Sequence, residues 1–288
     1  MTEYITLDKL PLETVRRCFL EAFGDYFVKI APGLEDFRRM NALRGVDYSV
    51  SMGVLEDGVL AGFTLSGVGN WRGLPTAYDA GTAVLKSSRG RGYSTGMFHR
   101  LKPLLKGRGI GLCLLEVIDG NQAAKTLYEK LGFRVTRRFV CQALKAGALR
   151  AGRPAGVEIT DVPLSAWPAL RAAMEGDEGF LPSWQNSWDS LRRLPDGFVV
   201  KAAWFGGEPA GYGVVAPAAG SMPQLWVRSG LRGRGIGSAL IAGLAGASRK
   251  GGALSWVNID ETRADVLKFL KARGFEPGLA QYEMELEL

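Results

Sequence analysis

The sequence predicts an α/β protein with mixed sheets, in which two domains repeat one order of helices and strands. Its 288 residues are about twice the usual domain length of about 150. The composition, with 47% hydrophobic and 23% charged residues, is that of a globular chain. The tetrapeptide Arg-Gly-Arg-Gly stands at 89–92 and again at 232–235, 143 positions later. A Gly-Phe pair at 132–133 returns at 274–275, so two landmarks recur at about half the chain length.

This offset indicates a tandem duplication. We expect an N-terminal domain over residues 1–146, a linker rich in Ala, Gly and Arg over 147–156, and a C-terminal domain over 157–288. In the first half, apolar residues on one helical face predict a helix around 15–23. Apolar runs at 48–55 and 59–65 flank an Asp-Gly pair, which is typical of a β-hairpin. The pattern then predicts strands at 76–85, 111–117 and 134–144, and helices at 94–105 and 122–131.

The second half repeats this order. The predicted elements are a helix at 165–174, strands at 198–205, 210–215 and 224–227, a helix that ends near 247, a strand at 254–259, a helix at 264–272 and a last strand at 281–288. The last strand alternates apolar residues with glutamates, so we expect one face to be buried and the other to be wet.

Cysteine usage and hydropathy exclude several classes of protein. The three cysteines, Cys18, Cys113 and Cys141, are an odd and widely spaced set without metal-ligand spacing. They indicate free buried thiols in a reducing compartment. The longest nearly apolar run, 236–247, is shorter than the roughly 18 residues of a membrane helix, and the chain opens without a secretory pattern. We therefore expect a cytoplasmic protein with no metal and no membrane partner.

Charge is concentrated in one half. The first 150 residues carry a net charge of +8 and the remainder −1, which together give the +7 of the chain. A basic half indicates an anionic ligand such as a nucleotide, a nucleic acid or a phosphorylated cofactor, and a solvated cationic surface is the alternative. Because the arginines of the Arg-Gly loops lack interleaved aromatic residues, no nucleic-acid partner is expected.

The two Arg-Gly loops have the properties of an anion site. Each lies between a predicted strand and a predicted helix, where backbone N–H groups and the helix N-terminus favour negative charge. Glycines let phosphate oxygens approach the amides, and Ser94, Thr95 and Ser238 supply hydroxyls at the helix starts. Neither loop has the Gly-Lys-Ser/Thr pattern of a P-loop. Thr95 and Ser238 stand where a dinucleotide fingerprint needs its third glycine.

A third alternative fits both loops. Val84-x₄-Arg89-x₂-Gly92-x-Ser94 and Val227-x₄-Arg232-x₂-Gly235-x-Gly237 resemble the acyl-CoA pyrophosphate motif of the GNAT N-acetyltransferase superfamily. The segment from Asn121 through Leu127-Tyr128 to Gly132-Phe133 is similar to its second signature. The whole chain resembles a bacterial tandem GNAT protein. This implies two tandem GNAT folds, each a mostly antiparallel sheet flanked by helices, and acetyl-CoA as the cofactor. The resemblance assigns coenzyme A binding to Val84, Arg89, Gly90, Arg91, Gly92, Tyr93, Ser94, Thr95 and Asn121, and to Val227, Arg232, Gly233, Arg234, Gly235, Ile236, Gly237 and Ser238.

The resemblance also implies that an acceptor amine attacks the thioester directly. It places Tyr128 as the general acid that protonates the leaving thiolate, and a core aromatic residue is the alternative interpretation. For the general base, Glu116 and Asp79 lie near the ends of the two strands that bracket the first loop, although both suit surface carboxylates too. Tyr26 and Phe27 stand where acceptor pockets of the family form.

The second half lacks these groups. The 142-residue shift places Leu270 at Tyr128 and Asn258 at Glu116. We therefore predict that the first half catalyses N-acetylation, and that the second shapes the acceptor cleft or binds coenzyme A without turnover. Activity in the second half and a non-catalytic acyl-CoA sensor are the alternatives. The expected partner is a small-molecule or peptide amine, and the protein is expected to be a monomer with an internal pseudo-dimer or a homodimer.

Overall fold

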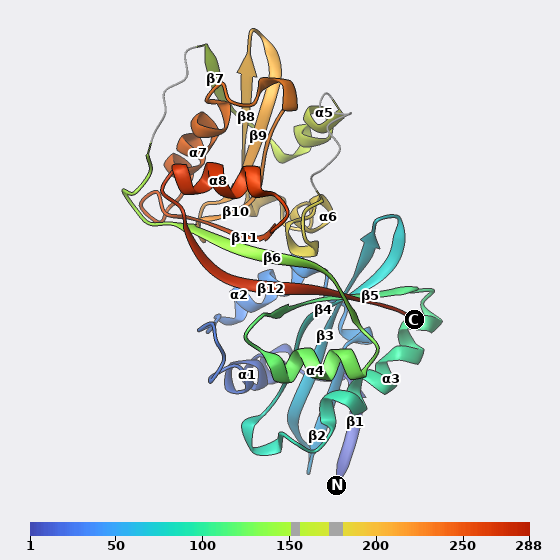
Figure 1. Cartoon of the computed structure of the whole chain (residues 1–288). Helices are drawn as coiled ribbons and strands as arrows, with labels where there is room; N and C mark the ends of the chain where they lie inside the picture. Colours follow the sequence, from blue (N-terminus) through green and yellow to red (C-terminus); the bar gives the residue numbers. More distant parts are fainter. Residues whose placement is uncertain (151–155, 173–180) are drawn as a thin grey trace. The chain divides into compact units, whose positions relative to one another are not determined.

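The computed structural model describes residues 1–150, 156–172 and 181–288 (Figure 1). The chain forms two compact units. Unit 1 consists of Met1–Thr136 and Tyr282–Leu288, and unit 2 consists of Arg137–Gln281. Each unit has a mixed sheet flanked by helices, so the predicted α/β fold class is confirmed.

In the sheet of unit 1, each strand is antiparallel to the next, except for the last two strands named below, which are parallel. Its strands, in sheet order, are β1 (Thr2–Thr6), β2 (Met52–Glu56), β3 (Val59–Trp71), β4 (Leu74–Val84) and β5 (Leu112–Ile118). Its helices are α1 (Leu12–Ala22), α2 (Leu34–Arg44), α3 (Tyr93–Gly107) and α4 (Gln122–Lys130). β4 and β5 are parallel, because α3 connects them across the sheet.

Two apolar clusters hold unit 1 together. One joins α3 to the sheet through fully buried side chains such as Met97, Leu105 and Leu115. The other is aromatic, with the Phe19 ring of α1 in contact with Phe37 of α2 and Phe63 of β3. The predicted helix around 15–23 is confirmed as α1, since its apolar residues are those that face the sheet.

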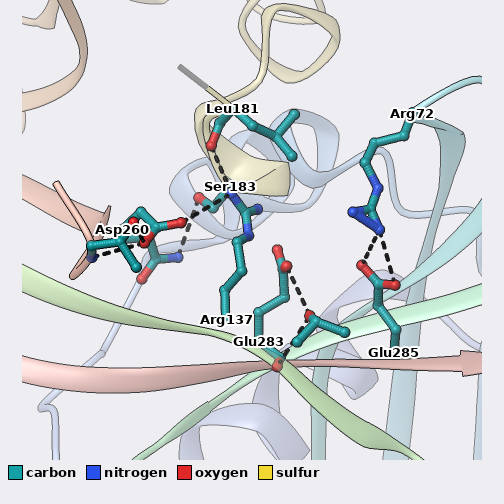
Figure 2. Close-up of polar contacts among 10 residues, drawn as sticks. Arg72, Arg137, Leu181, Ser183, Asp260, Glu283 and Glu285 are labelled. Atoms are coloured by element: carbon teal, nitrogen blue, oxygen red, sulfur yellow. Dashed lines mark hydrogen bonds and ion pairs between the residues drawn. The ribbon is translucent and has the colours of Figure 1, made fainter. Parts of the chain in front are cut away.

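The C-terminal end of β12 (Glu276–Glu287) belongs to unit 1, where it lies beside β5. Met284 is fully buried in the core of unit 1. Arg72 donates to both carboxylate oxygens of Glu285, at 3.0 and 3.2 Å, as Figure 2 shows. The chain end is fixed as well, because the Leu288 N–H donates to the Gly111 carbonyl at 3.0 Å.

We expect the Met284→Ala variant to lose about 2–5 kcal/mol of stability in unit 1, the usual cost of truncating a fully buried large side chain. Hydrogen exchange of the β5 amides measures this loss. Leu279→Ala is the control, because Leu279 lies on the same strand and is exposed. Equal protection of β5 in the two variants would contradict a structural role for the strand end.

Unit 2 repeats the arrangement. Its strands, in sheet order, are the 276–281 part of β12, the 137–144 part of β6 (Arg134–Leu144), β11 (Leu254–Asp260), β10 (Ser221–Val227), β9 (Glu208–Ala216), β8 (Val199–Phe205) and β7 (Val157–Val162). Its helices are α5 (Trp167–Ala172), α6 (Trp188–Leu191), α7 (Ile236–Ala247) and α8 (Ala264–Ala272). Here β10 and β11 are the parallel neighbours, as β4 and β5 are in unit 1.

The compact units do not coincide with the halves of the sequence. Most of β6 packs in unit 2, and the last seven residues pack in unit 1. The predicted domain limits 1–146 and 157–288 describe the sequence repeat and stay a prediction. Part of the predicted linker, 151–155, and the last two residues of the predicted helix 165–174 lie outside the described residues.

The expectation of buried cysteines is confirmed for two of the three. Cys18 and Cys113 are buried free thiols, whereas Cys141 is half-buried. In the part of the chain that the structure describes, no helix is long and apolar enough to cross a membrane.

Candidate functional site

The two Arg-Gly loops share one backbone conformation. Gly90 and Gly92 have φ of 80° and 75°, and Gly233 and Gly235 have φ of 81° and 85°. These left-handed values favour glycine. A Cβ added at Gly90, Gly92 or Gly233 would meet no atom within 4 Å, so the outer side of each loop is open at these positions.

Each loop ends in the N-cap of a helix. Gly92 caps α3 and Gly235 caps α7, and among the described residues no side chain accepts a capping hydrogen bond from either helix start. The first N–H groups of a helix have no acceptor within the helix, so they are available to an anion. Both loops therefore have the geometry of a phosphate site.

The first arginine of each loop braces it to the preceding strand. Arg89 Nε donates to the Val84 carbonyl, and Arg232 Nε donates to the Val227 carbonyl, at 3.1 Å in both cases. The second arginine of the first loop, Arg91, pairs with Glu56. The side chains of Arg89 and Arg91 thus contact protein groups, so the groups that this loop offers to an anion are mainly its backbone amides.

A cavity of about 650 Å³ adjoins the second loop in unit 2. This volume is within the range of sites for small molecules and cofactors. Its apolar wall includes Trp226, Trp256 and Phe269, and the ring of Phe269 packs on Gly237. Its charged lining residues are Arg232, Arg234, Arg263, Lys268, Arg273 and Asp265. An apolar wall with surplus positive charge suits an anionic ligand that carries an apolar chain.

In unit 1 a β-bulge lies beside the predicted catalytic residues. The parallel register of β4 and β5 runs from Thr76 opposite Leu112 to Asp79 opposite Leu115. At the same point the register of β4 against β3 shifts, which leaves Ala80 as an extra residue between Asp79 and Gly81. Bulges of this kind redirect side chains and are frequent near active sites.

The Asp79 carboxylate is the centre of a hydrogen-bond network at this bulge. Its Oδ1 accepts from the Gly81 N–H at 2.9 Å. Its Oδ2 accepts from the Thr82 hydroxyl at 2.7 Å and from the Tyr128 hydroxyl at 3.0 Å. The structure thus brings together two of the three predicted catalytic residues, Asp79 and Tyr128.

Burial has the largest effect on the pKa values of Asp79 and Tyr128 in this network. It raises the pKa of Asp79 above the ordinary range, although the hydrogen bonds from Thr82, Tyr128 and Gly81 act in the opposite direction. Burial and the neighbouring charge of Asp79 raise the pKa of Tyr128 well above 10. Tyr128 therefore keeps its proton at neutral pH, and this proton points to a carboxylate.

The third predicted residue, Glu116, has a different partner. Its Oε2 accepts a hydrogen bond from the buried hydroxyl of Tyr78. Arg44 donates to the carbonyl of the bulged residue Ala80 at 2.9 Å. Burial raises the pKa values of Asp79 and Tyr78, and the charge of Arg44 opposes part of that rise. Two carboxylates with separate partners thus lie on β4 and β5, where the strand pairing ends.

Aromatic side chains between α1 and α2 lie near the same network. The Tyr26 hydroxyl makes a polar contact with Asn121, the N-cap of α4. Burial raises the pKa of Tyr26, and the nearby charge of Asp79 adds to this rise. A Cβ built on Gly120 would lie 3.8 Å from the Phe27 ring, which is 58% exposed. These contacts place Tyr26 and Phe27 next to the β5–α4 turn.

Unit 2 has neutral groups at the corresponding positions. Leu270 is fully buried in the core. Asn258, with φ of 59°, is buried, donates to the Ser183 hydroxyl at 3.3 Å and accepts from Gln281 at 2.8 Å. The 143-residue shift of the loops places Met222, which is also fully buried, at Asp79.

A short turn, Trp184–Asn186, forms hydrogen bonds with both of the parallel strands of unit 2. The Asn186 carbonyl accepts from Gln224 of β10 at 2.6 Å, and the Asn186 side chain donates to the Val257 carbonyl of β11 at 2.7 Å. Arg137 donates to the Leu181 carbonyl at 2.7 Å, which holds the start of this turn (Figure 2). The place that holds the carboxylates in unit 1 is thus filled by backbone and amide groups in unit 2.

Two arginines of β6 and the single histidine of the chain lie apart from the Asp79 network. Arg137 and Arg138 belong to unit 2, where Arg138 pairs with Glu261 at 2.5 Å. His99 is exposed on α3. Sequence reasoning missed Tyr78 and Thr82, because their importance follows from contacts across strands.

We expect the Asp79→Asn variant to be more stable than the parent at neutral pH. The pKa of Asp79 is raised on folding, so the native state binds the proton more tightly, and stability falls as pH rises from about 4 through the folded-state pKa. Asparagine has no such titration, so the variant should lose this part of the pH dependence. Urea unfolding between pH 4 and pH 8 measures the effect, and a parallel pH profile in the two proteins would contradict it.

Sequence and structure comparisons agree with this geometry. The sequence profile of the Acetyltransferase (GNAT) family matches residues 12–133 and 161–275, so each repeat matches separately. No curated protein matches the chain significantly in sequence.

Solved structures resemble the whole chain. A GCN5-related N-acetyltransferase from Sphaerobacter thermophilus has a TM-score of 0.71 at 20% identity, over 100% of this chain and 95% of that one. A tandem GNAT protein from the clavulanic acid biosynthesis pathway has a TM-score of 0.73 at 16% identity, over 100% and 98% of the two chains. A GCN5-related N-acetyltransferase from Kribbella flavida has a TM-score of 0.64 at 16% identity and is covered over 71% of its length. At these identities the likeness concerns the fold.

Proposed function

The chain belongs to the GNAT family of acetyltransferases, and from this premise we propose that it is an N-acetyltransferase that transfers the acetyl group of acetyl-CoA to a primary amine. We assign the chemistry to unit 1. The observation that carries this assignment is the 3.0 Å hydrogen bond between Tyr128 and Asp79, beside the first Arg-Gly loop. Acetyl-CoA supplies the acetyl thioester, and the amides of residues 90–95 suit its pyrophosphate.

Transfer requires two proton movements, which the chain can assign to different groups. An amine must lose a proton to attack the thioester carbon, and the sulfur must gain one as the C–S bond breaks. Tyr128 suits the second task, because a phenol is protonated at neutral pH and can donate its proton to a thiolate. Both oxygens of Asp79 already accept hydrogen bonds from the protein, so Asp79 suits the orientation of Tyr128. Glu116 is then the better candidate for the base.

The acceptor is a small-molecule or peptide amine. The carboxylates of Asp79 and Glu116 favour a cationic group, and the rings of Tyr26 and Phe27 offer an apolar contact beside them.

For unit 2 we propose coenzyme A binding without turnover. The 650 Å³ cavity at its Arg-Gly loop supports binding. The neutral residues Leu270, Asn258 and Met222 at the catalytic positions argue against chemistry there. Unit 2 would then serve as a second acyl-CoA site in the same chain.

Thiol release from acetyl-CoA across a panel of primary amines tests this function. We expect release that depends on the amine, and calorimetry with coenzyme A should give two sites per chain. Binding of acetyl-CoA without thiol release for any amine would favour the acyl-CoA sensor instead.

A further inference from the structure

Most N–H groups of the Arg89 guanidinium donate hydrogen bonds to other groups of the protein. Besides the bond from Nε to the Val84 carbonyl, Nη1 donates to Asp25 Oδ2 at 2.7 Å. Nη2 donates to Asp25 Oδ1 at 2.8 Å and to the Ala22 carbonyl at 3.1 Å. A guanidinium has five N–H donors, so at most one remains for a ligand. The Arg-Gly loop is therefore joined both to β4 and to the end of α1.

Asp25 lies in a short segment, residues 23–27, that carries three aromatic rings. The ring of Phe23 packs against Phe19 of α1, with centroids 4.7 Å apart, and a Cβ built on Gly81 would lie 3.9 Å from it. The rings of Phe23, Tyr26 and Phe27 touch edge to face in sequence, with centroid distances of 5.0 and 5.4 Å. One end of this aromatic segment thus rests on the core and the bulge of β4.

The far end of the segment contacts the turn before α4. Tyr26 interacts with Asn121 and Phe27 lies by Gly120, while the bidentate pair with Arg89 holds the middle. Bidentate pairing between a guanidinium and a carboxylate fixes orientation as well as distance. The ion pair also lowers the pKa of Asp25 to about 2, so the contact persists at any neutral or mildly acidic pH.

We propose that Asp25 and Arg89 are positioning residues, whose ion pair holds the aromatic segment 23–27 as one wall of the acceptor-amine site. Arg89 then braces the wall to the cofactor loop and is not a ligand of the pyrophosphate. The wall is aromatic and partly exposed, so the acceptor it fits carries an apolar group near its amine. This inference rests on the function proposed above for unit 1.

Hydrogen exchange of the ligand-free protein tests the brace without any cofactor. The N–H groups of Phe23, Gly24 and Tyr26 are hydrogen-bonded to carbonyls, so their exchange can be followed. We expect Asp25→Asn to raise their exchange rates about tenfold or more, and Asp25→Glu to restore most of the protection. Asp57→Asn is the matched control, because it removes a carboxylate that pairs with the Met1 amine at a distant turn. Unchanged exchange in Asp25→Asn would overturn the proposal.

Calorimetry with coenzyme A and steady-state kinetics complete the test. For Asp25→Asn we expect the Kd of coenzyme A and the KM of acetyl-CoA to change less than threefold, while the KM of the best amine from the panel rises about tenfold. A tenfold gain in coenzyme A affinity would mean that the freed Arg89 binds the phosphates, and a tenfold loss would mean that the ion pair holds the cofactor loop and not the acceptor wall. Either result would overturn the proposal. Absence of coenzyme A binding in every variant, the parent included, would instead contradict the proposed function, and the exchange result would still decide on the brace.

Discussion

We expect the Tyr128→Phe variant to turn over about a hundredfold more slowly than the parent protein. The substitution removes the hydroxyl that is held by Asp79 at 3.0 Å and leaves the ring, which packs edge to face on Phe133 with centroids 5.6 Å apart. General acid catalysis contributes typically about 10²–10⁴ in rate. A hundredfold loss corresponds to about 2.7 kcal/mol of transition-state stabilisation. Thiol release at saturating acetyl-CoA measures it.

The effect should be confined to kcat. Because Tyr128 is outside the Arg-Gly loop, coenzyme A affinity should stay within threefold of the parent value. Tyr48→Phe is the matched control, since it removes another partly buried hydroxyl of unit 1, one that accepts from Asn41 at 2.9 Å. Equal turnover in Tyr128→Phe and the parent would show that Tyr128 is not the general acid. The same loss in Tyr48→Phe would mean that the loss reflects damage to the fold.

The repeated elements were predictable because each carries a strong local signal. The Asp-Gly turn gave the β2–β3 hairpin, and the two Arg-Gly loops gave the joints between β4 and α3 and between β10 and α7. Other elements are weakly coded. β1 is a short strand of mixed polarity, and the last six residues of β3 include two glycines and an asparagine, so the predicted strand ended at residue 65. Their strand conformation comes from pairing with β2 and β4.

The residues of the candidate site could be predicted from the sequence, but the hydrogen bonds between them could not. The motif pointed to Tyr128, and strand ends pointed to Asp79 and Glu116. No sequence pattern shows that Asp79 accepts from Tyr128 while Glu116 accepts from Tyr78, because these bonds depend on the bulge at Ala80. The alternation of β12 predicted one buried face and one wet face, and Met284 confirms the buried one. The wet face was wrong at Glu283, which is fully buried and accepts a hydrogen bond from the Thr136 hydroxyl at 3.1 Å. That the end of β12 packs beside β5 is a long-range pairing, which local patterns do not specify.

We expect the same glycine-to-valine substitution to affect catalysis very differently when it is made in the first Arg-Gly loop and when it is made in the second. Gly92→Val and Gly235→Val place the same β-branched side chain at left-handed positions with φ of 75° and 85°. A β-branched residue strains this conformation, and its methyl groups would stand over the amides at the start of α3 or α7. We expect Gly92→Val to lower kcat/KM for acetyl-CoA by more than a hundredfold. Gly235→Val should leave kcat/KM within threefold.

Each variant serves as the control for the other, because both glycines are the N-caps of their helices and have a left-handed φ, so the strain is of the same kind in both. Calorimetry should give one coenzyme A site per chain in either variant, in unit 2 for Gly92→Val and in unit 1 for Gly235→Val. If Gly235→Val abolished thiol release and Gly92→Val did not, the chemistry would belong to the unit with the 650 Å³ cavity, and the Asp79–Tyr128 pair would be structural. Loss of release in both would mean that turnover needs both loops, which the neutral residues at Leu270 and Asn258 argue against, since a loop without an acid or base can only bind.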